Sequence, residues 1–126
     1  MPRSAAATAL ARVRKICLSF PETSERDSHG APAFFVAAKR QFVAFADNHH
    51  GDGRLALWCA APPGVQGMLV DGAPDRYFVP AYVGPMGWVG VRLDRGTPWS
   101  EVAGVIEGAY VARAPARLVA AWRRRT

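Results

Sequence analysis

Two arginine–tryptophan pairs occur at positions that would share one face of a β-strand. Arg54 and Trp58 lie in the run RLALWCA, and Trp88 and Arg92 lie in the run WVGVRLD. Each pair is spaced i and i+4, and alternate side chains of a strand project from the same face. An indole can stack on a nucleic-acid base while a neighbouring guanidinium binds phosphate. The pairs predict a stacking platform on a sheet, unless that face is covered and the indoles are ordinary core residues.

The basic residues are concentrated towards the two ends of the chain. The formal net charge is +6. Residues 1–20 and 113–126 contain nine arginines or lysines and no acidic residue, whereas residues 21–112 contain seven basic and ten acidic residues, a balance of −3. Contact with an acidic polymer is therefore expected chiefly from the ends of the chain. The alternative is that these charges are simply solvated, as runs of surface charge usually are.

These patterns define a set of candidate DNA-binding residues. Lys39 and Arg40 are expected at the tip of a hairpin, where they would form a basic wing tip. The full set is Lys39, Arg40, Arg54, Trp58, Trp88, Arg92, Arg12, Lys15, Arg117 and Arg123. The predicted partner is DNA, bound without sequence preference, and binding should weaken as salt rises because association releases counterions.

One polar loop contains residue types that bind metals. Asp47, His49, His50 and Asp52 lie together in this loop. Adjacent histidines on an extended chain point apart, and the loop has neither an H-x-x-x-H spacing nor a cysteine. We therefore expect a solvated loop and no metal site.

No arrangement typical of a catalytic centre is present. The sequence has no G-x-S-x-G, no P-loop and no dinucleotide-binding glycine pattern after a strand. Cys17 and Cys59 each stand alone in an apolar run, which is typical of core thiols rather than a disulfide or metal pair. We expect neither an enzyme nor a bound cofactor.

The connection Pro80–Trp88 offers a second class of function. Tyr82 and Met86 lie in this proline- and glycine-rich segment and could line an exposed apolar groove. That groove would make the protein a non-enzymatic module for a protein partner or a small ligand. The alternative is a rigid loop whose aromatic residues cover the edge of the core.

Hydrophobic periodicity indicates which elements must position these residues. Leu10, Val13, Cys17 and Phe20 predict a first amphipathic helix. Thr97 is predicted to cap a later helix with Pro98 in its first position. The other expected elements are strands at 33–38, 41–46, 54–60, 77–79 and 88–94, an edge strand within 22–32, a short helix within 62–72 and a last helix around 118–122.

Length and composition favour one globular domain over residues 1–126. Half of the residues are hydrophobic and 21% are charged, which is ordinary for a folded domain. The order of elements predicts an α+β fold with a single antiparallel sheet and helices packed mainly on one face. No apolar run is long enough to cross a bilayer and no secretory signal is present, so a cytoplasmic location without membrane contact is expected.

Four stretches of the sequence resemble the MmcQ/YjbR family of small bacterial proteins. They are FVPAYVGPMGWVGVRLD, FFVAAKRQFVAF, LSFPETSE and EGAYVARAP. The resemblance covers a core of about residues 9–120 and leaves a basic tail at 121–126. Lys39, Trp88 and Tyr110 stand where the family has a recurrent lysine, tryptophan and tyrosine.

The resemblance implies a double-wing α+β fold that is structurally akin to bacterial frataxin. It also implies a DNA-binding role that rests on comparison of folds, and it implies no catalytic or metal-binding residues. Iron binding of the frataxin type needs an acidic first helix, whereas the first helix here is basic.

Overall fold

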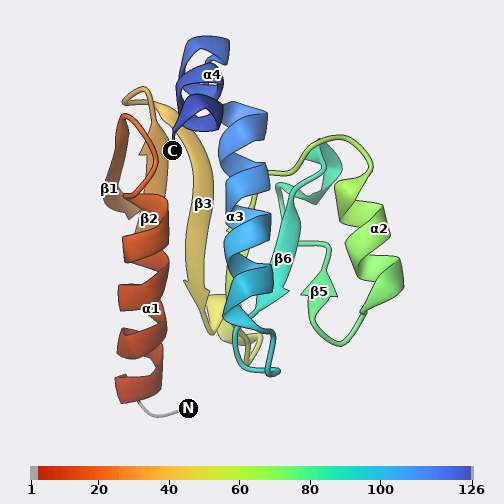
Figure 1. The fold of residues 1–126 in the computed structure, drawn as a ribbon. Helices are drawn as coiled ribbons and strands as arrows, with labels where there is room; N and C mark the ends of the chain where they lie inside the picture. The colour runs from red at the N-terminus through yellow and green to blue at the C-terminus, as the bar shows by residue number, and fades with distance from the viewer. Residues whose placement is uncertain (1–2, 126) are drawn as a thin grey trace.

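A sheet of six antiparallel strands is the centre of the fold, in the order β1-β2-β3-β4-β6-β5 (Figure 1). The structure is a computed structural model that describes residues 3–125. The strands are β1 (Thr23–Ser28), β2 (Ala31–Val36), β3 (Arg40–Asp47), β4 (Leu55–Cys59), β5 (Tyr77–Phe78) and β6 (Val89–Arg92). The predicted α+β class and single antiparallel sheet are confirmed.

The helices lie mainly on one face of this sheet, as predicted. They are α1 (Arg3–Cys17), α2 (Val65–Gly72), α3 (Trp99–Arg113) and α4 (Ala116–Arg124), and two short 3-10 turns are η1 (His49–Gly51) and η2 (Gly84–Met86). Figure 1 shows α1 and α3 crossing in front of the sheet, α4 above α3, and α2 beside the β5 edge. Within residues 3–125, no helix combines the length and the apolarity that a membrane span needs.

Side chains that alternate along the central strands form the core between the sheet and the helices. Leu57 of β4 lies opposite Phe45 on one side and Val91 on the other, and all three are buried. Val13 of α1 and Ile106 of α3 are fully buried in the same cluster. Burial of apolar surface on this scale is the main favourable term in folding.

An aromatic cluster attaches α4 to the rest of the molecule. The ring of Phe20, after α1, stacks on Tyr110 at 4.6 Å and meets Trp122 of α4 edge-on at 4.5 Å. A bulge in the β2–β3 pairing, where the register shifts between Phe34 and Phe35, makes Phe42 the extra residue of β3. Phe42 is fully buried and meets the Tyr110 ring edge-on.

The β2–β3 turn differs from the prediction by two residues. Lys39 and Arg40 were expected to form it, but Ala37 and Ala38 adopt the left-handed conformation, with φ of 52° and 71°, and Arg40 begins β3. Alanine rarely occupies this region because its Cβ crowds the backbone, so the sequence gives no signal for the turn. Lys39 remains exposed beside it.

The start of α3 also differs from the prediction. Pro98 occupies the N-cap position and α3 begins at Trp99. The Thr97 hydroxyl does not cap the helix, because it donates to the carbonyl of Arg92 at 2.8 Å. Thr97 therefore fixes the connection between β6 and α3.

The strand β1 forms an edge of the sheet and pairs with β2. Its sequence TSERDS consists entirely of polar and charged residues. This confirms the edge strand expected within residues 22–32.

Candidate nucleic-acid interface

The predicted arginine–tryptophan pairs lie on the face of the sheet opposite α1 and α3. Trp58 pairs with Gly90, and Ala56 pairs with Arg92. Because the intervening Leu57 and Val91 point into the core, the side chains of Arg54, Trp58 and Arg92 project from the other face. The alternation predicted for β4 and β6 is correct.

The two indoles on this face are less accessible than a stacking platform requires. Trp88 is 7% exposed. Its carbonyl accepts a hydrogen bond from Gln66 of α2 at 2.6 Å, and its amide approaches the Val83 carbonyl at 3.4 Å. Trp58 is half-buried, with the His49 ring 4.6 Å away. The connection before β6 folds back on the sheet and encloses Trp88, so this ring cannot stack on a base.

The two arginines of this face already have partners. Arg92 makes two hydrogen bonds to Asp94, at 2.8 and 3.0 Å. Burial alone would raise the pKa of Asp94, but hydrogen bonds from Arg92 and the Leu55 amide outweigh it and the pKa is lowered. Arg54 forms an ion pair with Asp52 at 3.9 Å, and its guanidinium carbon lies 4.0 Å above the Phe78 ring. Neither arginine therefore presents an uncommitted guanidinium to a phosphate.

A different group of arginines surrounds the β2–β3 turn. Arg40 donates to the carbonyl of Arg113 at 3.1 Å, and Arg113 donates to the carbonyl of Gln41 at 3.0 Å. On the other side of the turn, Arg26 donates to the carbonyl of Ala38 at 2.8 Å. Within residues 3–125, none of these three arginines forms an ion pair with a carboxylate. Backbone oxygens fix the positions of all three, and the Arg26 guanidinium carbon also lies 3.5 Å from the Phe35 ring.

Helix α4 adds further cations at this end of the molecule. Arg117 makes two hydrogen bonds to Glu22, at 2.8 and 3.2 Å, and the Glu22 carbonyl accepts from the amide of Ala37 in the turn. The hydrogen bond from Arg117 lowers the pKa of Glu22. Arg123 and Arg124 are exposed near the end of α4.

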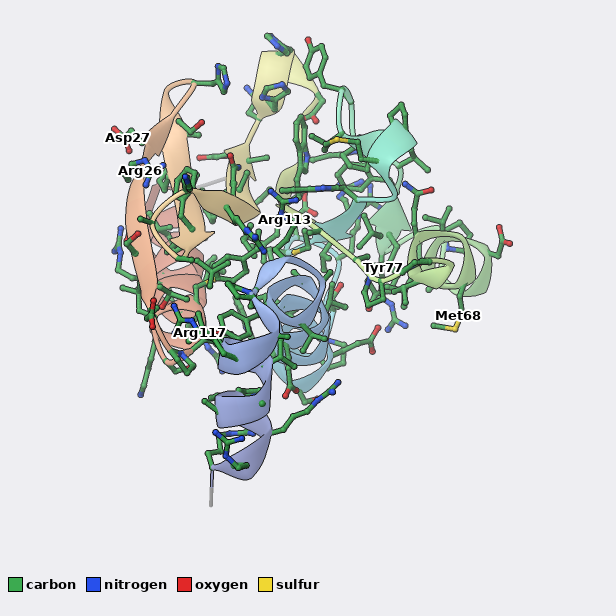
Figure 2. All side chains as sticks on the ribbon, turned by 90° about the horizontal axis from the view of Figure 1, so that it is seen from above. Arg26, Asp27, Met68, Tyr77, Arg113 and Arg117 are labelled. Carbon is green, nitrogen blue, oxygen red and sulfur yellow. The ribbon has the colours of Figure 1, made fainter. Side chains whose placement is uncertain are left out.

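We call this group of cations the basic end. It consists of Arg26, Lys39, Arg40, Arg113, Arg117, Arg123 and Arg124. Figure 2, which looks onto this end, shows Arg113 near the middle of the view, with Arg26 and Arg117 towards β1. Glu22 pairs with Arg117 and Asp27 follows Arg26 on β1, so the basic end has a net positive charge that these two carboxylates reduce.

The structure brings together some of the predicted residues and separates others. Lys39, Arg40, Arg117 and Arg123 belong to the basic end. Arg12 lies elsewhere on α1, with its guanidinium carbon 4.5 Å from the Trp99 ring. Lys15 is also on α1 and exposed. Thr126, the last residue of the predicted basic tail, lies outside the described residues.

The predicted set omitted two members of the basic end. Arg26 stands between two acidic residues in sequence, and Arg113 ends a helix, so neither has a local signal for phosphate binding. Both reach the β2–β3 turn by contacts between distant parts of the chain. Only a correct tertiary arrangement could have identified them.

The polar loop is not the extended chain that the sequence prediction assumes, because it contains the 3-10 turn η1 and the ring centroids of His49 and His50 lie 4.1 Å apart. Among residues 3–125, no cluster of three or more histidine, cysteine or acidic side chains could hold a metal ion. Cys17 and Cys59 are both buried and free. Burial raises the pKa of each thiol well above its ordinary value, so the reactive thiolate is disfavoured.

Comparison with known proteins gives one family and one similar fold. The model of a family named YjbR matches residues 18–112. The crystal structure of Deinococcus radiodurans protein DR2400, described by its domain DUF419, matches with a TM-score of 0.69 over 82% of this chain and 76% of that one. The two sequences are 19% identical, so the likeness concerns the fold. No match was found among curated proteins.

Proposed function

The chain belongs to the YjbR family, and from this premise we propose that it binds DNA through phosphate contacts made by its basic end. The observation that supports the proposal is the set of three arginines, Arg26, Arg40 and Arg113, that are fixed by backbone carbonyls without a carboxylate partner. Fixed guanidinium groups lose little side-chain entropy when they bind an anion. DNA has a closely spaced row of such anions.

Binding of this kind is directed at the backbone and does not distinguish sequences. Phosphate contacts position a protein on DNA, whereas base contacts specify the sequence. The face of the sheet opposite α1 and α3 is not part of the proposed DNA interface, because Trp88 is buried and Arg92 is paired with Asp94. If the basic end neutralises about four phosphates, the logarithm of the association constant should fall with the logarithm of salt concentration with a slope of roughly −3.6.

Fluorescence anisotropy with a labelled duplex at several salt concentrations tests the proposal. Lys39→Glu should weaken binding at least several-fold and make the salt slope shallower, since it removes a cation from the basic end. Arg95→Glu is the matched control. Arg95 is also exposed, lies in the β6–α3 connection, and undergoes the same change in charge. Thermal unfolding of both variants would show that neither substitution disrupts the fold.

Two results would contradict the proposal. One is the absence of binding to duplex DNA at low salt. The other is an equal loss of affinity in the two variants, which would mean that net charge rather than the basic end controls the interaction.

A strained turn favours an interaction module as a second function. Tyr82 has a φ of 65°, and the amide of Val83 donates to the carbonyl of Ala81 across it at 2.6 Å. This is a γ-turn of the strained, positive-φ kind. The Tyr82 side chain is nevertheless 74% exposed, and Met86 nearby in sequence is 65% exposed. Strain of this kind is concentrated at functional sites, and exposed tyrosine and methionine are common in interfaces.

For this interaction module, we propose that the bound ligand or partner covers Tyr82. A thermal-shift screen of small molecules on the wild type and on Tyr82→Ser is the direct test, because a ligand of the native state raises the unfolding temperature. Hits that lose their effect in the variant would support the site. A set of hits that is unaffected by the substitution would place binding elsewhere.

A further inference from the structure

An apolar groove separates α2 from α3, away from the basic end. It has a volume of about 370 Å³, within the range of small-molecule sites. Val65 and Leu69 of α2 form one wall, and Val105 of α3 forms part of the other. Tyr77 of β5 lies between the two helices in Figure 2 and closes one end.

A glycine in the middle of α3 keeps this groove open. Gly104 lies one turn after Glu101 on the same helix face, and both line the groove. Glycine weakens a helix interior because its backbone is more flexible than that of other residues. A Cβ at position 104 would meet no atom within 4 Å, so packing within the chain does not require glycine there. Its structural effect is to leave the wall of the groove without a side chain.

The polar end of the groove is a hydrogen-bonded group of three side chains. The Tyr77 hydroxyl donates to Oε1 of Glu101, and a guanidinium nitrogen of Arg76 lies 3.3 Å from the same oxygen. Burial, followed by the hydrogen bond to Glu101, raises the pKa of Tyr77, so the phenol stays neutral at physiological pH. In the described part of the chain, no hydrogen bond to Oε2 of Glu101 is formed. This carboxylate can therefore accept further hydrogen bonds.

The charges on the surrounding segments are mainly negative. Asp71 lies in the last turn of α2, and Asp75 follows in the turn before β5. Glu101 lies on α3 and lines the groove itself. Against these three carboxylates, the basic residue at the groove end is Arg76, which pairs with Glu101. A ligand with positive charge is the electrostatic complement of this side of the molecule.

We propose that the groove binds a small organic cation with an apolar body, such as an alkylammonium or arylammonium compound. The ammonium group donates to Oε2 of Glu101, and the hydrocarbon body lies along Val65, Leu69 and Val105. The site shares no residue with the basic end, so its occupation does not depend on DNA binding.

Binding can be tested by NMR with protonated hexylamine as the probe and hexanoate as its anionic counterpart. We expect hexylamine at millimolar concentration to shift the amide signals of α2 and α3, and hexanoate to leave them unchanged. Glu101→Gln should weaken hexylamine binding at least tenfold. Glu107→Gln is the matched control on the same helix, and it should weaken binding less than threefold because Glu107 does not line the groove.

A second variant separates loss of the groove from loss of the fold. Gly104→Leu should fill the groove and abolish the shifts, while its unfolding temperature stays at or above that of the wild type, because leucine is a better helix former. If Gly104→Leu fails to fold, Gly104→Ala should still weaken binding.

Three outcomes would overturn the proposal. They are the absence of shifts with hexylamine and with benzylamine, equal shifts with hexanoate, and shifts that persist in the folded Gly104 variants. Since duplex DNA binding is measured separately with Lys39→Glu, failure of the groove is distinguishable from failure of the basic end.

Discussion

At the scale of single residues, Tyr82 combines backbone strain with exposure. A positive φ at a non-glycine residue costs of order 1 kcal/mol, and the exposed ring returns little burial energy. We expect Tyr82→Gly to raise the free energy of unfolding by about 1 kcal/mol, because glycine adopts this conformation without a steric penalty. Urea denaturation measures the change. Tyr82→Ala is the control: it removes the ring but keeps the steric cost, and an equal gain in this variant would refute the strain argument.

Two glycines are expected to respond to alanine in opposite directions. A Cβ at Gly90 would lie 2.3 Å from the Phe78 ring, so Gly90→Ala must displace that ring or bend β6. We expect a loss of about 1–3 kcal/mol in unfolding free energy. Gly104→Ala meets no atom within 4 Å and should gain about 1 kcal/mol from helix propensity. Chemical denaturation of both variants tests this, and a shared sign would contradict it.

At the scale of elements, the position of α4 depends on the aromatic cluster. Trp122 contacts Phe20 and donates from its indole nitrogen to Glu107 at 2.7 Å. Trp122→Ala should lower the free energy of unfolding by about 2 kcal/mol. This is less than the loss expected for a fully buried tryptophan, because Trp122 is half-buried. It should also weaken DNA binding, because the arginines of α4 lose their fixed place. Trp122→Phe, which keeps the ring contacts, should retain most of both properties, and DNA affinity that is unchanged in Trp122→Ala would exclude α4 from the interface.

How much of these elements could be predicted depends on the range of the interactions that form them. The alternation in β4 and β6 is local, and it gave the correct face for Arg54, Trp58 and Arg92. The burial of Trp88 follows from the path of the connection before β6, which no local pattern specifies. The left-handed Ala37 and Ala38 also lack the glycine or asparagine that usually identifies such a turn.

The candidate site was less predictable than the fold for the same reason. Lys39, Arg40, Arg117 and Arg123 were recognised from local charge. Their association with Arg26 and Arg113 arises from hydrogen bonds across the β2–β3 turn that join residues far apart in the sequence. The family resemblance identified the α+β fold, but it supplied no residue roles.

At the scale of the whole molecule, positive and negative charges are distributed unevenly along the sequence. The helices α1 and α4 lie outside the matched range 18–112 and contain no acidic residue, whereas the segment between them contains all ten. Much of the basic end is therefore supplied by α4, beyond the family match. If phosphate binding depends on α4, the binding residues include some that lie outside the part of the chain that matches the family.

The free energy of unfolding should decrease in acid, because hydrogen bonds from arginines lower the pKa of carboxylates in the folded state. The pKa of Asp94 is lowered in the folded state, so its contribution is present above the unfolded value of about 3.9 and is lost as pH falls through the folded value. Glu25 behaves in the same way, because its hydrogen bonds from Arg14 lower its pKa. We expect the free energy of unfolding, measured by urea denaturation, to decrease below about pH 4. Asp94→Asn should make this decrease shallower, and an unchanged pH profile in that variant would show that Asp94 does not contribute.

The polar character of β1 has a consequence for the behaviour of the protein at high concentration. An edge strand exposes unpaired amide and carbonyl groups that can recruit a strand from another molecule. In β1, Glu25, Arg26 and Asp27 place three consecutive charges along that edge, and a second copy would have to desolvate them in order to pair. The charged edge strand therefore disfavours strand pairing between molecules, and concentrated solutions of the protein should not form fibrous aggregates.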